Sequence, residues 1–251
     1  YLDLAAGEYN IQIRGAGASE SSSPVFETGM LTVPDGARIT AIAAGKLMSM
    51  NEDDKFRVMV KVENFTDPGM GNAAVRVVHA SADAPAVAVD VGNDGTPEIN
   101  DFARFDGDSG EAGVALPANQ ALQIGIWAGS PLGRVTAFTT PALPDGGELF
   151  VIATGLLGEL PRDDAGFGLL AVGPNGTIGL IRQNPVVFAL HASPDAPPVD
   201  IYAGDAALST GLAFGELTDP IQVPTGAYTL SFRAAGSMSE AASAGTPTLM
   251  A

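Results

Sequence analysis

The sequence predicts an all-β protein built from tandem β-sandwich modules of immunoglobulin-like type. Three observations lead to this class. Apolar residues alternate with polar ones in several short segments, which is the period of a half-buried strand. No segment keeps an apolar period of 3.6 residues, and 31 glycines and 18 prolines supply turns between short strands. Segments of the sequence also recur, which predicts repeated modules.

Two pairs of repeated segments mark the modules. "HASADAPAVAVDVG" at 79–92 returns as "HASPDAPPVDIYAG" at 191–204. "TVPDGARITAIAAGKL" at 32–47 resembles "ALPDGGELFVIATGLL" at 142–157. The spacing of each pair is close to 110 residues, which is an ordinary domain size.

A third repeated segment occurs three times, as "LAAGEYNIQIR" at 4–14, "LPANQALQIGIW" at 116–127 and "VPTGAYTLSFR" at 223–233. Each copy ends in a run with period two. A one-residue slip would turn the core face of the strand outward, so the extra residue of the middle copy must lie in its turn.

These repeats divide the chain into three modules. Residues 1–72 are predicted to be the C-terminal part of a first module, 73–184 a complete module, and 185–251 the N-terminal part of a third. "TDPGMGN" at 66–72 and "RQNP" at 182–185 are predicted to be linkers. The complete module should contain seven strands, near 74–79, 86–91, 112–116, 121–127, 134–139, 148–154 and 167–172.

The two partial modules need something to complete them, because a sandwich without some of its strands exposes sheet edges and half of its core. We expect the chain to be a segment of a longer array. Completion between chains, by pairing the third module of one copy with the first module of the next, is the alternative.

Composition excludes several partners and sites. The 29 acidic and 12 basic residues give a net charge of −17, which disfavours nucleic acid and anionic membrane surfaces. The absence of cysteine rules out disulfides and thiolate metal sites. No apolar run approaches the roughly 20 residues that a membrane-spanning helix needs.

The repeated phrase contains His-x-Ser-x-Asp, which raises the question of a catalytic triad. His79, Ser81 and Asp83 are each two residues apart, so in an extended chain they would be spaced by about 6–7 Å, too far for a Ser–His hydrogen bond. With Pro85 closing the phrase, we favour a structural turn in which Ser and Asp satisfy backbone groups. The second copy carries the same four residues: His191, Ser193, Asp195 and Pro197.

A structural role for this phrase predicts a cost on removing its carboxylates. We expect Asp83→Ala and Asp195→Ala each to destabilise the chain by about 1–3 kcal/mol, as the loss of a buried turn cap would.

The segments "VRVVHASADAPAV" at 75–87 and "FALHASPDAPPVDIYAG" at 188–204 resemble the opening signature of the bacterial and archaeal domain of unknown function 4397. This resemblance covers nearly the whole chain. It implies a secreted or cell-surface β-sandwich, often in tandem, without a known activity. The copies differ at one position, because Ala88 stands where Asp200 stands. We therefore expect any role of that aspartate not to be shared by both modules.

Two further features are candidate sites. Asp106, Asp108 and Glu111 in "DGDSGE" have the spacing of part of a calcium loop, but a polar surface turn explains them equally simply and is favoured. Trp127, the only tryptophan, points away from the core face of its strand. It is either an anchor for a protein or glycan ligand, or a side chain covered by a neighbouring loop.

Asn64 and Asn175 begin glycosylation sequons, which matter only in a host that glycosylates exported asparagines.

We therefore expect a non-enzymatic, exported or cell-surface protein with a structural or adhesive role, as a spacer, matrix component or filament subunit. A glycan- or protein-binding module that uses Trp127 and the loops at one end of the sandwich is the alternative. A hydrolase using His79 or His191 is a third and weaker hypothesis. No cofactor is expected, with calcium as the one candidate.

Overall fold

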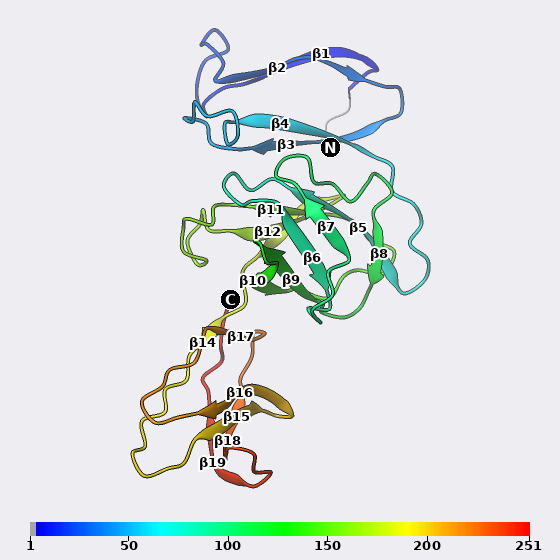
Figure 1. Ribbon diagram of the computed structural model, residues 1–251. Coiled ribbons are helices and arrows are strands. Elements are labelled where there is room, and N and C mark those ends of the chain that lie inside the picture. Colours follow the sequence, from blue (N-terminus) through cyan, green and yellow to red (C-terminus); the bar gives the residue numbers. More distant parts are fainter. Residues whose placement is uncertain (1–3) are drawn as a thin grey trace.

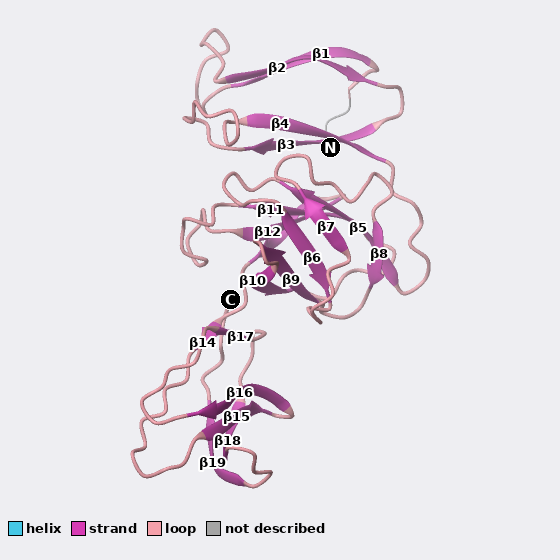
Figure 2. Cartoon of the chain, viewed as in Figure 1, coloured by secondary structure: helices cyan, strands magenta, loops and turns pink. Residues whose placement is uncertain are grey.

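The computed structural model of the chain describes residues 4–251, and every regular element in that range is a β-strand (Figures 1 and 2). The predicted all-β class is therefore confirmed. Within the same range there is accordingly no helix that is long and apolar enough to cross a membrane. Figure 1 shows the strands in three successive groups. We call them the N-terminal module (1–72), the central module (73–184) and the C-terminal module (185–251).

The central module consists of two facing sheets. One sheet has four strands in the order β10-β9-β6-β7, and the other has five in the order β13-β12-β11-β5-β8. The strand bounds are β5 Asn72–His79, β6 Val87–Val91, β7 Ile99–Phe102, β8 Val114–Pro117, β9 Gln123–Ala128, β10 Gly133–Thr139, β11 Glu148–Thr154, β12 Gly168–Gly173 and β13 Gly176–Ile181. Seven of these strands lie where the alternation predicts them, while β7 and β13 are additional.

One pair of strands in the five-stranded sheet runs parallel. β11 pairs with β5 from Glu148 opposite Ala74 to Ala153 opposite His79, and the other pairs in the two sheets are antiparallel. The parallel pair departs from the two antiparallel sheets of an immunoglobulin-like fold. It joins the first strand of the module to a strand formed late in the sequence, so the module closes through a long-range contact.

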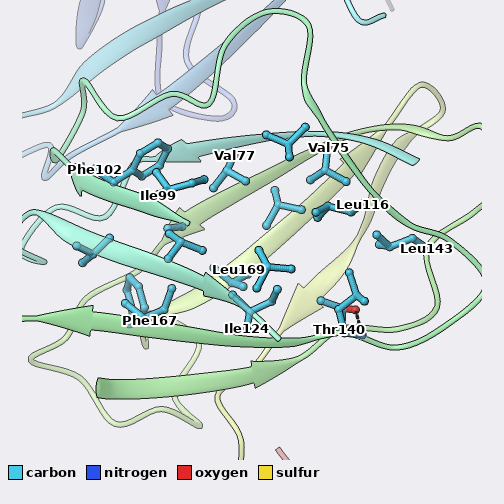
Figure 3. A pocket seen from close by; sticks show the side chains of 18 residues that line it. Val75, Val77, Ile99, Phe102, Leu116, Ile124, Thr140, Leu143, Phe167 and Leu169 are labelled. Atoms are coloured by element: carbon cyan, nitrogen blue, oxygen red, sulfur yellow. Dashed lines mark hydrogen bonds between the residues drawn. The ribbon is translucent and has the colours of Figure 1, made fainter. Parts of the chain in front are cut away.

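Apolar side chains from both sheets fill the space between them (Figure 3). Phe138 and Phe167 meet with ring centroids 6.0 Å apart. A cavity of about 60 Å³ remains between the sheets, and Thr140 is the only polar residue in its lining. The hydroxyl of Thr140 accepts a hydrogen bond from the Leu122 amide. A cavity this small, whose single polar residue is already hydrogen-bonded to the backbone, is a packing defect of the core rather than a binding site.

The N-terminal module contains two hairpins. β1 (Gly7–Ile13) pairs with β2 (Phe26–Val33), and β3 (Arg38–Ala44) pairs with β4 (Arg57–Glu63). By the repeats, these four strands are equivalent to β9, β10, β11 and β12.

The β3–β4 hairpin covers the outer face of the five-stranded sheet, the face that points away from the four-stranded sheet. Figure 1 shows this hairpin lying over the central module. The two modules share an apolar cluster, which is formed by Ile42, Ala44 and Met59 from the hairpin and by Val78, Ala80, Ala82, Phe105, Phe150 and Ile152 from the central module. Arg38 also forms an ion pair with Glu148 at 2.9 Å. The middle of the five-stranded sheet, at β5 and β11, is thus buried on both faces.

The C-terminal module repeats part of this architecture. Its strands are β14 Val186–Val187, β15 Val199–Ala203, β16 Ala206–Leu212, β17 Ile221–Gln222, β18 Thr229–Ala234 and β19 Glu240–Gly245. The sheet β16-β15-β18-β19 matches β7-β6-β9-β10, and the pair β14-β17 matches β5-β8.

The segment between the central and C-terminal modules is held in place by hydrogen bonds. The side-chain oxygen of Gln183 accepts a hydrogen bond from the Thr136 hydroxyl, and the backbone amide of Asn184 donates to the Ala137 carbonyl at 2.8 Å. Asn184 is buried. The segment predicted as a linker at 182–185 therefore packs along β10.

Candidate functional site

The repeated phrase of the central module forms the turn between β5 and β6, and its polar side chains bind backbone groups. Ser81 is fully buried and its hydroxyl donates to the Gly155 carbonyl at 2.8 Å. The half-buried Asp83 carboxylate accepts the amides of Leu157 and Gly158 at 2.8 and 3.1 Å. The phrase thereby ties the β5–β6 turn to the turn that follows β11.

His79 does not activate Ser81. Its side chain is completely buried, and Nε2 lies 3.0 Å from the Pro85 carbonyl. Among residues 4–251, no group forms a hydrogen bond with Nδ1. Burial lowers the pKa of His79, with a smaller contribution in the same direction from Arg104 and an opposing one from the bond to Pro85. A triad needs the histidine bonded to the nucleophile at an accessible place, and neither condition holds at His79.

The turn after β11 is built tightly around Gly155. This residue has a φ of +79°, and a Cβ added to it would lie 2.2 Å from the Gly166 carbonyl oxygen. Gly45 occupies the equivalent place after β3, with a φ of +84° and an added Cβ 2.3 Å from the Lys55 carbonyl oxygen. Only glycine fits both requirements, so this turn is a second fixed feature of the repeat.

The second copy of the phrase keeps the histidine contact but has no such turn beside it. His191 Nε2 lies 3.1 Å from the Pro197 carbonyl, as in the first copy. Ser193 and Asp195 are exposed, and the serine hydroxyl donates to the carboxylate at 3.0 Å. The Ser193 amide donates to His191 Nδ1, so the histidine faces backbone and not the serine hydroxyl.

The residues with calcium-loop spacing do not converge. Asp106 and Glu111 are exposed, whereas Asp108 receives hydrogen bonds from Arg76 at 2.6 and 2.8 Å and an ion pair from Lys61 at 2.8 Å. Burial alone would raise the pKa of Asp108, but these bonds outweigh it and lower that pKa to about 2. In residues 4–251 no group of three or more acidic or histidine side chains is placed to hold a metal ion. Asp108 instead joins the N-terminal module to the central one.

Trp127 lies on the outward face of β9, as the alternation predicts, and it is half-buried. Its indole N–H donates to the carboxylate of Asp90 at 3.1 Å. Asp90 is completely buried and also accepts the amides of Asp94 and Gly95 at 3.1 and 2.8 Å. These three donors satisfy a charge that would otherwise be costly to bury.

Most of the chain matches a known protein family. A family model described as domain of unknown function (DUF4397) matches residues 1–90 and 186–251, which together are more than half of the chain. The chain belongs to this family. No curated protein matches it. DUF4397 is a family of unknown function.

The two DUF4397 phrases differ in the position of their buried aspartate. Asp200 in the C-terminal module accepts the amides of Gly211 and Gly236 at 2.7 and 2.8 Å. Its equivalent in the central module is Ala88, but Asp90 stands two residues further along the same strand face. Asp90 accepts amides of the turn that follows it, whereas Asp200 accepts amides of two other segments, so the donors differ although period two keeps both positions on one face. That any role of Asp200 is not shared by both modules stays a prediction.

The aromatic and the charged residue exchange places between the two modules. In the C-terminal module Tyr202 stands at the Asp90 position, and the Arg233 guanidinium lies 4.2 Å from its ring centroid. In the central module Trp127 stands at the Arg233 position. Each module thus pairs one aromatic and one charged side chain diagonally across the same two strands.

Proposed function

We propose that this DUF4397 chain is a non-enzymatic tandem β-sandwich protein with a structural or adhesive role outside the cell of a bacterium or archaeon. The proposal depends on one observation, which is that the polar side chains of the repeated phrase bind backbone groups. The buried Ser81 and the half-buried Asp83 hold backbone groups of the β11 exit turn, and His79 holds the backbone at Pro85. Polar groups that are committed to backbone serve the fold and not a substrate.

Two further features support a role outside the cell in a structural assembly. The strong negative charge favours solubility in salty surroundings and disfavours nucleic acid. The resemblance of the HASPDAP phrase to secreted and surface modules supports the proposed location.

The test of the non-enzymatic role is labelling with a fluorophosphonate probe, which modifies activated serines. We expect no labelling of the purified chain, because Ser81 is buried and neither serine hydroxyl is bonded to a histidine: that of Ser81 donates to the Gly155 carbonyl and that of Ser193 to Asp195. Labelling that disappears in Ser81→Ala or Ser193→Ala would refute the proposal. Protease treatment of intact cells, followed by detection of the chain, tests its location.

A glycan- or protein-binding role is the second candidate, and the surroundings of Trp127 favour it. The indole ring is partly accessible, and Arg134 donates to Asn93 at 3.3 Å beside it. An aromatic face with polar neighbours is suited to a sugar ring. A glycan array should show binding that Trp127→Ala removes, whereas Val135→Ala, an exposed position on the neighbouring strand, should leave it unchanged. An array without any signal would exclude the glycan-binding role.

A further inference from the structure

The most exposed apolar side chains of the molecule are methionines. Six of the seven methionines lie at the surface, and each is more exposed than every other large apolar side chain that the structure describes. Leu190 is the most exposed of those others at 61%, whereas the six methionines range from 67% to 99%. The six are Met30, Met48, Met50, Met70, Met238 and Met250. Methionine is among the residue types that are most often fully buried, so this distribution is the reverse of the ordinary one.

The six exposed methionines do not form one site. They are spread from β2 and the β3–β4 loop, through the segment before β5, to the β18–β19 turn and the residues after β19. A soft metal ion needs several sulfur ligands at one point, and a docking surface needs a continuous apolar patch. Neither use explains thioethers at positions so far apart in the chain.

The property that the six positions share is an accessible sulfur atom. Leucine, isoleucine and valine would supply apolar surface without sulfur, but none of them occupies a position this exposed in the described part of the chain. A thioether differs from these side chains in that two-electron oxidants convert it to a sulfoxide. The chain has no cysteine, so no thiol competes with the methionines for an oxidant.

The β3–β4 loop shows how the fold presents such sulfur atoms. The hydroxyl of Ser49 donates to the carboxylate of Asp54, and the Lys46 amide donates to the Asp54 carbonyl at 2.7 Å. These bonds fix the loop with Ser49 turned toward it. Met48 and Met50, on either side of Ser49, are 90% and 94% exposed.

The seventh methionine is shielded from solvent. Met59 is 7% exposed and belongs to the apolar cluster that the N-terminal and central modules share, together with Ile42 and Phe150. A sulfoxide is polar, and inside this cluster its oxygen would be buried among apolar side chains. At the six exposed positions the same oxygen would face water. Oxidation should therefore be tolerated at the surface and destabilising at Met59.

We propose that the six exposed methionines are oxidation sites through which the chain consumes peroxide-class oxidants without losing its fold. In each event the thioether sulfur attacks one oxygen of hydrogen peroxide, and the O–O bond breaks. The sulfur keeps that oxygen, and the other leaves as water with both hydrogen atoms. The sulfur is oxidised by two electrons and the peroxide is reduced by two. One chain thus consumes six equivalents of peroxide, independently of its structural or adhesive role.

The test is peptide mass spectrometry of the purified chain during incubation with hydrogen peroxide, with circular dichroism and Trp127 fluorescence recorded in parallel. We expect the six exposed methionines to gain oxygen together, and Met59 to react at least roughly tenfold more slowly because it is buried. After six oxidations the spectra and the melting temperature should be unchanged. Oxidation of Met59 at the rate of the others, or loss of the fold once the six are oxidised, would overturn the proposal.

Leucine variants separate the sulfur from the apolar surface, because leucine and methionine have similar volumes. The double change Met48→Leu and Met50→Leu should consume two equivalents of peroxide fewer, and replacement of all six should remove the rapid uptake. Met59→Leu is the matched control and should leave the rapid uptake unchanged.

A competition assay measures the protective effect directly. The chain is mixed with a methionine-containing reporter peptide, and peroxide is added below the total amount of methionine. The unaltered chain should reduce oxidation of the reporter, and the variant with six leucines should not. Equal oxidation of the reporter in the two mixtures would show that the exposed methionines do not act as the oxidant-consuming groups.

Discussion

Replacing Asp83 and Asp195 separately should give two different results, although both residues occupy the same place in the repeated phrase. The Asp83 carboxylate accepts two backbone amides from the β11 exit turn and is half-buried. Hydrogen bonds to a charged group contribute about 1.5–3 kcal/mol each when shielded. Leu157 and Gly158 are exposed, so water can replace part of this stabilisation. Asp83→Ala should therefore cost about 1–3 kcal/mol.

Asp195 has no such turn to hold. Its carboxylate lies at the surface and accepts the hydroxyl of Ser193, without a backbone amide from the described part of the chain. Asp195→Ala should change the free energy of unfolding by less than about 0.5 kcal/mol. The equal costs expected from the sequence are thus revised, because only the first copy of the phrase lies beside an exit turn.

Urea unfolding measures both effects. Trp127 is the only tryptophan and lies in the central module, so its fluorescence follows the module that contains Asp83. With an m-value of about 2 kcal/mol/M, Asp83→Ala should lower the midpoint by about 1 M. The unfolding of Asp195→Ala is followed by circular dichroism. Asp83→Asn is a milder variant of the first change, because its side chain keeps one oxygen acceptor. Equal midpoint shifts for the two alanine variants would refute the reasoning.

Three more changes test other contacts. Burial lowers the pKa of His79 below its unfolded value near 6.5, so the unfolded state binds more protons as the pH falls. Stability should be full above about pH 6.5 and decline below it, and His79→Gln should flatten this limb of a stability-against-pH curve. Asp108→Leu should cost about 3–5 kcal/mol because it strands the Arg76 charge, whereas the double change with Arg76→Phe should cost clearly less; equal losses in a double-mutant cycle would contradict this. Gly155→Ala should cost about 2–4 kcal/mol in thermal unfolding, since its φ is positive and its Cβ would overlap the Gly166 carbonyl; an unchanged melting temperature would show that the turn can relax.

The alternation of apolar and polar residues predicted most strand positions but not the pairing of β5 with β11. Alternation located seven strands of the central module, because each has one face on a large core. β7 was not predicted because it is only four residues long and contains Asp101, whose φ is +53°. β13 has neither a regular alternation nor a buried residue. The parallel contact of Ala74 with Glu148 depends on residues far apart in the sequence, so no local pattern announces it.

The sequence predicted the structural role of the candidate site, but not the residues that its side chains bind. Proline and the spacing of the phrase indicated a structural turn, but the partner Gly155 lies in the turn after β11, more than 70 residues away in the sequence. The outward direction of Trp127 followed from alternation, whereas its bond to Asp90 depends on a diagonal neighbour across two strands. The segment "VAVD" at 87–90 could have indicated Asp90, because Asp90 lies two residues after Ala88 and therefore on the same face of the strand.

The parallel pairing of β5 with β11 bears on how the chain folds during synthesis. Domains form from the N-terminus onward, so β5 is complete long before β11 exists. At that moment β3 is already present, and its segment at 32–47 resembles that of β11, including the glycine that begins the exit turn. In the finished protein β3 lies on the outer face of the sheet and β5 keeps its edge for β11. The repeat that builds the array therefore also supplies a false partner for β5, and the order of synthesis presents this false partner first.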